Sequence, residues 1–307
     1  MAQRVAVTGA NGFVGRHLTQ HASALGWEVV GVVRSEGAAR AVSEAGGRAV
    51  VLGARDPLAF ARSLEGCRAV VHLAQIGSER SDATYDAVNV AGTERVIEAA
   101  RAAGVERLVY FSGLGVARYG LAPRCTNPYF LSKLAAEVAL FRSGRDAVVF
   151  RPSYIVGPGD AFVPTLLKAM ATGEVERPGD GSYRLQPIAV TDAAALVVAA
   201  IERPGRAGPR VFDLVGPEPL AYARFLDRLA AVARAHGRPA DYRVREVPIE
   251  EADRQARGKG GYQGMHEDAL DCLLCDEVSD PAPLEALGGR FLTPLDESLA
   301  AAVRAAS

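Results

Sequence analysis

The chain has 307 residues, of which 49% are hydrophobic and 23% charged, with a formal net charge of −1 at pH 7. This composition excludes global disorder and collagen-like order, and the balanced charge gives no electrostatic support for a nucleic-acid partner. No apolar run approaches the roughly 20 residues of a membrane span. The four cysteines are unevenly spaced and predict no disulfide framework. We therefore expect a cytoplasmic protein without nucleic-acid or membrane partners.

The first half of the chain alternates between short strand patterns and helical patterns. Strands are expected at 4–8, 28–33, 48–52, 69–73, 107–112 and 147–151, and helices at 14–25, 37–45, 57–64, 82–103 and 128–141. Continuous apolar strands between helices are typical of a parallel sheet covered on both faces. We predict an α/β fold with a Rossmann-type, doubly wound parallel sheet.

The pattern loosens after residue 151, where proline and glycine cluster at 157–160 and 178–182. A helix at 191–202, a strand near 210–214 and a helix near 220–235 follow. We expect a dinucleotide-binding domain at 1–156 plus about 187–215, and a smaller, partly discontinuous substrate lobe at 157–186 plus about 216–307. Ligands of doubly wound folds bind at the carboxyl edge of the sheet, where this lobe would lie.

Glycines recur at every third position in the turn that follows the first strand. Gly9, Gly12 and Gly15 form the pattern GxxGxxG, and a helical pattern begins at once. Glycine permits the sharp turn and lets a pyrophosphate approach the N-terminus of the helix, where free N–H groups favour anions. The turn predicts dinucleotide binding, with Asn11, Phe13 and Val14 as further contacts.

The end of the second strand bears on the choice of dinucleotide. Proteins that bind NAD usually place an acidic residue there for the ribose 2′-hydroxyl. Here Arg34 and Ser35 follow the strand, and a guanidinium with a neighbouring hydroxyl suits a 2′-phosphate. The position favours NADP over NAD, although arginine is the usual cation of this chain and the alternative is a solvated surface arginine.

Tyr129 and Lys133 begin another helical pattern and lie four residues apart, on one face of the helix. With nine tyrosines and three lysines in the chain, chance predicts roughly 0.09 such pairs. A lysine ammonium would lower the pKa of the phenol and hold the nicotinamide ribose. The tyrosine would then exchange the proton that accompanies hydride transfer.

Together these motifs resemble the short-chain dehydrogenase/reductase superfamily, and within it the extended and atypical-extended branch of NAD(P)-dependent epimerases, dehydratases and reductases. Further segments that resemble the family are VHLA at 71–74, NVAGT at 89–93, RPSYIVGPG at 151–159 and QPIAVTD at 186–192. The resemblance implies a small-molecule substrate and a homodimer formed through 82–103 and 128–141. It also implies cofactor contacts at Leu73, Ala74, Asn89, Pro152 and Ile155.

The sequence departs from the family pattern after the fifth strand. Leu114 stands where family members usually carry the catalytic serine or threonine. Ser112, at the strand end, is our candidate for the third catalytic residue, and Thr126 is a second candidate. The adenine-binding acid of the family is also missing after the third strand, where Asp56 is displaced and is not assigned.

Three functions remain open on these residues. The first is an oxidoreductase that transfers hydride on a small carbonyl or hydroxyl substrate, with tyrosine as the acid or base. The second is a sugar-type epimerase or dehydratase that uses transient oxidation. The third is a non-catalytic dinucleotide-binding sensor or assembly protein, which Leu114 favours and the Tyr129–Lys133 pair opposes.

Metal binding is not predicted. Cys272 and Cys275 form a lone CxxC without a second ligand pair, and we interpret them as free thiols. His17 and His21 lie four residues apart on the first helix but lack the glutamate of HExxH, so we interpret them as surface or packing residues.

Overall fold

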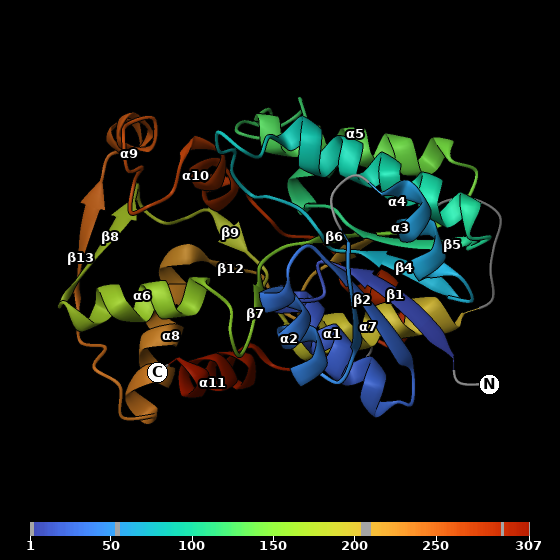
Figure 1. Cartoon of the computed structure of the whole chain (residues 1–307). Coiled ribbons are helices and arrows are strands. Elements are labelled where there is room, and N and C mark those ends of the chain that lie inside the picture. The colour runs from blue at the N-terminus through green and yellow to red at the C-terminus, as the bar shows by residue number, and fades with distance from the viewer. Residues whose placement is uncertain (1–2, 53–55, 204–209, 290–291, 307) are drawn as a thin grey trace.

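A parallel sheet of seven strands forms the centre of the computed structural model, which describes residues 3–52, 56–203, 210–289 and 292–306 (Figure 1). The strands are β1 (Arg4–Thr8), β2 (Glu28–Val33), β3 (Arg48–Val51), β4 (Ala69–His72), β5 (Arg107–Phe111), β6 (Asp146–Pro152) and β11 (Arg210–Leu214). Their order is β11-β6-β5-β4-β1-β2-β3. The order reverses between β1 and β4, as in doubly wound dinucleotide-binding folds, so the predicted fold class is confirmed.

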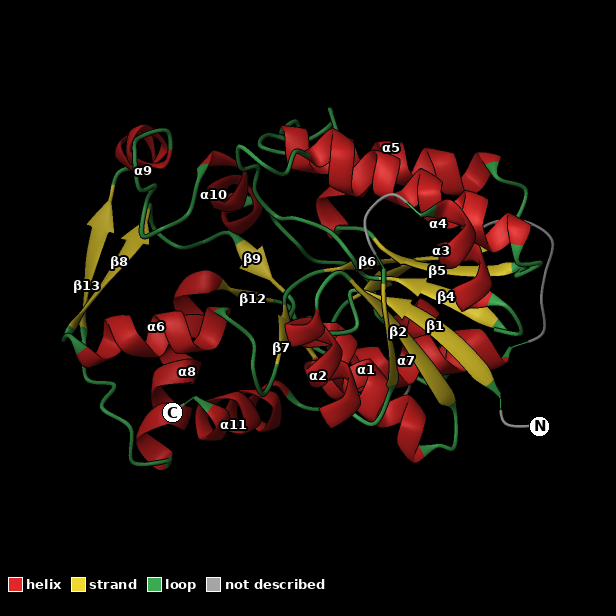
Figure 2. Cartoon of the chain, in the orientation of Figure 1, coloured by secondary structure: helices red, strands yellow, loops and turns green. Residues whose placement is uncertain are grey.

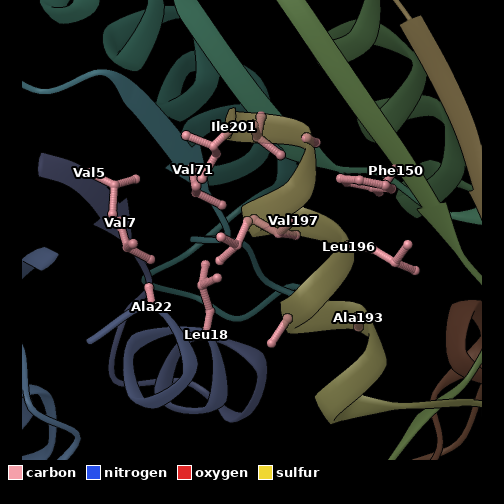
Figure 3. Packing of buried hydrophobic residues seen from close by; sticks show 14 of the residues in the cluster. Val5, Val7, Leu18, Ala22, Val71, Phe150, Ala193, Leu196, Val197 and Ile201 are labelled. Carbon is pink, nitrogen blue, oxygen red and sulfur yellow. The ribbon is translucent and has the colours of Figure 1, made fainter. Parts of the chain in front are cut away.

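Helices cover both faces of this sheet. They are α1 (Phe13–Ala24), α2 (Glu36–Glu44), α3 (Pro57–Leu64), α4 (Ala91–Ala102), α5 (Pro128–Arg142) and α7 (Val190–Glu202). Successive strand residues point to opposite faces. Thus Val5 and Val7 pack with α1, α2 and α7, whereas Ala6 packs with α3, α4 and α5. Figure 3 shows the first of these layers, in which Leu18 of α1 and Val197 of α7 meet below the strands.

The sequence-predicted bounds of these elements agree with the structure within two residues, except for the helix expected at 82–103. There the chain forms a π-helical turn, Asp86–Val90, before α4 begins at Ala91. The side chain of Asn89 inside this turn bonds to both backbone groups of Ile76, at 2.9 and 3.1 Å. We attribute the widened turn to this tertiary contact, which a helical sequence pattern does not reveal.

A second hydrophobic core lies beside the carboxyl edge of the sheet (Figure 2). It is built mainly by α6 (Phe162–Ala171), α8 (Tyr222–Ala235) and α11 (Leu295–Ala305). The remaining elements are β7 (Ile155–Val156), β8 (Glu174–Pro178), β9 (Arg184–Leu185), β10 (Ile188–Ala189), β12 (Leu220–Ala221), β13 (Arg243–Val247), α9 (Ile249–Ala256), α10 (Glu267–Leu274) and the 3₁₀-helices η2 (Leu114–Arg118) and η3 (Ala282–Leu287). In the part of the chain that the structure describes, no helix has the length and apolar character needed to cross a membrane.

Candidate active site

The glycine loop joins β1 to α1 at the carboxyl edge of the sheet. Gly9 has a φ of 71°, and a Cβ on it would lie 2.8 Å from the backbone nitrogen of Ala74. A Cβ on Gly15 would lie 2.3 Å from the carbonyl oxygen of Gly9. The Gly12 N–H donates to that same oxygen at 2.9 Å. Because α1 has neither a side-chain cap nor an acidic residue in its first turn, this bare backbone forms a cradle suited to a phosphate.

A buried hydrogen-bond chain supports the loop from below. Thr8 Oγ1 lies 2.6 Å from His72 Nδ1, and His72 Nε2 lies 3.2 Å from Thr93 Oγ1. Burial, with a smaller contribution from the charge of Lys133, lowers the pKa of His72 to about 3. A neutral imidazole therefore joins β1, β4 and α4, and its role is structural.

The two residues predicted to select the dinucleotide follow β2. Arg34 is exposed, and among the described residues its side chain has no hydrogen-bond or ion-pair partner. Ser35 caps α2, because its hydroxyl accepts from the Ala38 N–H at 3.3 Å. Asp56 likewise caps α3 through Ala59, which accounts for this unassigned acid. Residues 53–55, beside it, lie outside the described residues.

The other residues predicted to contact the cofactor lie along the same edge of the sheet, and Asn89 has a structural role as well. Asn11, Phe13 and Val14 lie in the glycine loop and the first turn of α1, Leu73 and Ala74 follow β4, Pro152 ends β6 and Ile155 lies in β7. The amide of Asn89 is 1% exposed and donates to Ser132 Oγ at 3.0 Å besides its bonds to Ile76. Asn89 therefore connects the segment after β4 to α5.

The start of α5 places Tyr129 in the first turn of the helix. Asn127 caps α5 by accepting from the Phe130 N–H at 2.9 Å, and Pro128 occupies the first helical position, where its missing N–H is not needed. Lys133 follows one turn later, with its ammonium 6.0 Å from the centre of the Tyr129 ring. The predicted placement of the pair on one face of the helix is confirmed.

The contacts of Lys133 differ from the expected ones. Its ammonium is fully buried and donates to the carbonyl oxygen of Phe111 at 2.6 Å and to the Tyr110 hydroxyl at 3.3 Å. Burial raises the pKa of Tyr129 well above its usual 10, and nearby Cys272 raises it further. The pKa of Tyr129 is therefore raised overall, and not lowered as the spacing of Tyr129 and Lys133 predicted. Tyr129 is a protonated phenol, and its hydroxyl has no hydrogen-bond partner within the described residues.

Burial also lowers the pKa of Lys133, to about 7. Between that value and the unfolded value of about 10.5, the unfolded chain binds more protons than the folded one. The free energy of unfolding should therefore rise with pH in this window. Between pH 7 and 9.5, we expect the free energy of unfolding to rise by up to about 3 kcal/mol less in Lys133→Met than in the wild type. Urea denaturation without dinucleotide measures this difference.

Lys168→Met, which changes an exposed lysine of α6, is the matched control and should leave this rise as it is in the wild type. An equal rise in the wild type and in Lys133→Met would contradict the buried-ammonium interpretation.

Ser112 and Leu114 lie directly after β5. Ser112 is 2% exposed, and its hydroxyl oxygen is buried without a hydrogen-bond partner. A Cβ on the intervening Gly113 would lie 3.8 Å from the Tyr129 ring, so this segment runs beside the tyrosine. Leu114 is 5% exposed and starts η2. Thr126 is exposed, outside this buried group.

The CxxC cysteines have a partner that the sequence did not indicate. Cys275 Sγ lies 3.4 Å from the sulfur of Cys125, and all four cysteines are free. Burial raises the pKa of Cys272 and of Cys275 well above the usual thiol value.

His17, interpreted above as a surface or packing residue, contacts the carbonyl oxygen of Pro158 through Nε2 at 2.8 Å. No group of three His, Cys, Asp or Glu among the described residues is arranged to hold a metal ion.

Two further residues of this region were missed by sequence reasoning. Tyr154 follows β6 and stacks near Phe162 of α6, with ring centres 4.7 Å apart. Glu277 lies after α10 with 7% of its surface exposed, and its charge, when ionised, contributes to the raised pKa values of Tyr129 and Tyr154. No motif marks Glu277, because it lies in the mixed C-terminal part of the sequence.

The model of the NAD dependent epimerase/dehydratase family matches residues 5–215. The chain belongs to this family. Membership confirms the predicted class, an NAD(P)-dependent oxidoreductase or epimerase of the extended short-chain type, and its nicotinamide cofactor. Over 322 aligned residues the chain is 31% identical to 4-hydroxy-2-methyl-3-oxo-4-farnesyl-3,4-dihydroquinoline-1-oxide ketoreductase of Stigmatella aurantiaca, covering 88% of this chain and 95% of that protein.

Two further proteins are similar to this chain. The 2-alkyl-3-oxoalkanoate reductase of Stenotrophomonas maltophilia is 31% identical over 254 residues, which cover 76% of each chain. The structure of UDP-glucuronic acid 4-epimerase from Bacillus cereus, with UDP-glucuronic acid and NAD, superimposes with a TM-score of 0.76 at 19% identity over 99% of each chain. The last comparison supports the fold.

Proposed function

We propose that this family member is a ketone reductase in which Tyr129 donates the proton. The observation that carries the proposal is the protonated, unpartnered Tyr129 hydroxyl, whose ring lies 3.8 Å from a Cβ on Gly113, the residue after the equally unpartnered Ser112. A protonated phenol is the form needed to protonate the oxygen of a ketone as it becomes an alcohol. Two relatives that are 31% identical bear the names of a ketoreductase and an oxoalkanoate reductase.

The residues at the sheet edge fit a dinucleotide. The bare loop at Gly9, Gly12 and Gly15 would receive the pyrophosphate, because any Cβ at Gly9 or Gly15 would fill the space. The buried Ser112 oxygen and the Lys133 ammonium would hold the nicotinamide half. The bound cofactor would supply the hydride that reduces the carbonyl carbon.

The protein's own residues would then have three tasks. Tyr129 would give its proton to the carbonyl oxygen, so that the ketone becomes a secondary alcohol. Lys133 would stabilise the phenolate left behind, since its ammonium is 6.0 Å from the ring. Ser112 would take over the hydrogen bond to substrate or cofactor that family members make from the position of Leu114.

The aromatic residues next to the sheet edge favour an apolar ketone as substrate. Tyr154 contacts Phe162, whose ring centre is 5.4 Å from that of Phe225. These rings border the second core. Initial rates of NADPH and NADH oxidation with a panel of alkyl ketones test the proposal, and tight dinucleotide binding without any turnover would contradict it.

Arg34 is proposed to select NADP over NAD. Its exposed guanidinium, free of partners within the described residues, would pair with a 2′-phosphate, while Ser35 is engaged as a helix cap. We expect Arg34→Ala to weaken NADPH binding by about 10- to 100-fold, since a lost charge-assisted hydrogen bond costs about 1.5–3 kcal/mol. NADH binding should change less than twofold.

Calorimetric titration of the variant with each dinucleotide measures both effects. Arg40→Ala, which removes another exposed arginine on the neighbouring helix, is the matched control and should leave both affinities unchanged. Equal weakening of NADPH and NADH by Arg34→Ala would refute the NADP preference.

A cytoplasmic homodimer with two regions per chain completes the proposal. The dinucleotide-binding region is 1–156 plus about 187–215, and the rest is the substrate lobe. Leu131 and Val138 on α5 are 49% and 38% exposed, and a dimer formed through α4 and α5 would cover them. Light scattering after gel filtration tests the dimer. Four free thiols fit a reducing compartment.

A second candidate is a non-catalytic dinucleotide-binding protein. The buried Leu114, in place of the usual catalytic hydroxyl, favours it. An epimerase or dehydratase would begin with hydride transfer in the opposite direction, from substrate to NAD(P)⁺. Only a reductase consumes NAD(P)H in stoichiometric amounts, and product formation without net consumption of the dinucleotide would distinguish an epimerase or dehydratase from a non-catalytic binder.

A further inference from the structure

The segment 276–279 crosses the carboxyl edge of the sheet and is held there by hydrogen bonds from both sides. Arg118, in η2 after β5, donates to the carbonyl oxygens of Asp276 and Val278 at 2.8 and 3.3 Å. The Ser279 N–H donates to Gln186 Oε1 at 3.0 Å. The backbone on both sides of residue 277 is therefore fixed by residues that are far away in the sequence.

The backbone N–H and the backbone carbonyl oxygen of Glu277 each form a hydrogen bond. Its N–H donates to the carbonyl oxygen of Arg184 at 2.8 Å, and its carbonyl oxygen accepts from Ser153 Oγ at 2.9 Å. Ser153 lies directly after β6, and Arg184 lies in β9. The backbone position of Glu277 is thus set by the sheet edge and by the substrate lobe together.

The carboxyl group of Glu277 has no such partner. The residue is 7% exposed, and within the described residues its side chain makes neither a hydrogen bond nor an ion pair. Its electrostatic neighbours are Tyr129 of α5, Tyr154 after β6, Cys272 and Cys275 at the end of α10, and Arg118 of η2. Burial raises the pKa of Glu277 to about 8, against the opposing charge of Arg118.

Most buried polar groups in folded proteins are hydrogen-bonded. Glu277 is a buried residue whose carboxyl group has no hydrogen-bond or ion-pair partner within the described residues, and its charge acts on the pKa of the proposed proton donor Tyr129. A titratable group with a perturbed pKa near a proposed active site is a candidate ligand contact. The neutral acid offers one O–H donor, which suits an oxygen acceptor better than a cation.

We propose that Glu277 is a substrate-binding residue whose carboxyl group forms a hydrogen bond with a second oxygen of the ketone substrate. The substrate class is then a 1,3-dicarbonyl compound, such as a 3-oxoacid ester, with its ketone oxygen at Tyr129 and its second carbonyl oxygen at Glu277. This inference rests on the proposed ketone reductase function and names its substrate class.

Two ketones of equal chain length test the inference. Ethyl 3-oxohexanoate carries the second carbonyl group, and nonan-4-one lacks it. We expect wild-type kcat/KM to favour the ester by at least tenfold. Glu277→Leu should lower this ratio at least tenfold, because only the ester loses a hydrogen bond to this residue. Glu277→Gln should keep the ratio, because its amide still donates, and the exposed Glu250→Gln is the matched control.

The pH dependence gives a second readout. The wild-type preference for the ester should fall as pH rises above about 8, where the acid ionises, and the Glu277→Gln preference should not. The pKa of Glu277 is higher in the folded protein than in the unfolded chain. Its contribution to the free energy of unfolding is therefore fully present below about pH 4.5 and is lost as pH rises through 8. Thermal unfolding of Glu277→Leu between pH 5 and 8 should lack this loss, which also shows that the variant folds.

Ester binding to the protein with NADP⁺, which cannot reduce a ketone, separates this inference from the proposed function. Binding that depends on Glu277 without any turnover by NADPH would refute the reductase and uphold Glu277 as a ligand contact. Ester binding that is absent, or equal in wild type and Glu277→Leu, would overturn the inference. A Glu277→Gln variant as impaired as Glu277→Leu would overturn the neutral-donor role.

Discussion

Tyr129→Phe is expected to lower kcat for ketone reduction by about 10²–10⁴-fold, because it removes the proton donor while leaving the ring in place. The ring packs against Tyr85 and Phe130, with centres 5.9 and 5.5 Å away, and phenylalanine keeps both contacts. The hydroxyl has no hydrogen-bond partner among the described residues, so its loss should leave stability nearly unchanged. Initial rates of NADPH oxidation with ethyl 3-oxohexanoate and nonan-4-one, together with the thermal midpoint, measure these effects.

The matched control is Tyr242→Phe, which removes the hydroxyl of a half-buried tyrosine that packs against the second hydrophobic core. It should keep kcat within twofold of the wild type. NADPH binding to Tyr129→Phe, followed by fluorescence, should also stay within a few-fold, because the phenol contributes to the chemical step rather than to the phosphate cradle. If Tyr129→Phe retained more than a third of wild-type kcat, the role of Tyr129 as proton donor would be refuted.

Gly15→Ala is expected to weaken NADPH binding by at least 100-fold. The added methyl carbon would lie 2.3 Å from Gly9 O and 2.7 Å from Ala10 Cα, and both are backbone atoms of the loop that would hold the pyrophosphate. The loop must move to relieve this overlap, since no flexible side chain can give way. We also expect the free energy of unfolding to fall by about 1–3 kcal/mol, the usual cost of overpacking.

Gly37→Ala provides the matched control for this change. Gly37 lies in α2, and a Cβ on it would meet no atom within 4 Å. Alanine favours a helix over glycine by about 0.5–1 kcal/mol, so this variant should be slightly more stable with unchanged NADPH affinity. Calorimetric titration and urea denaturation of both variants distinguish the two sites. Tight NADPH binding by Gly15→Ala would refute the glycine loop as the phosphate site.

The sequence predicts the sheet and its helices well, because each depends on neighbouring residues. Apolar runs that begin and end within a few residues set the strands, and local caps such as Ser35 and Asn127 set the helix starts. The exception is the π-helical turn before α4. It depends on contacts of Asn89 with Ile76, thirteen residues earlier, which a helical period cannot register.

The sequence predicts which residues form the site better than it predicts their pKa values. The spacing of Tyr129 and Lys133 correctly places the ammonium near the ring. The direction of the pKa shift of Tyr129 depends first on burial and then on the charges of residues from distant parts of the chain, among them Cys272 and Glu277. Spacing contains no information on burial of this kind, and so the expected lowering was wrong.

By itself the sequence determined the family, the fold class and the two motifs at the sheet edge. The glycine loop and the Tyr129–Lys133 pair are each formed within one turn or helix, so geometry follows directly from spacing. Only the tertiary structure decided what surrounds them. It brings Glu277 across 124 residues to Ser153 and places Cys125 beside Cys275, 150 residues away. Such contacts are set by how the C-terminal part of the chain packs on the sheet, and no local pattern records that packing.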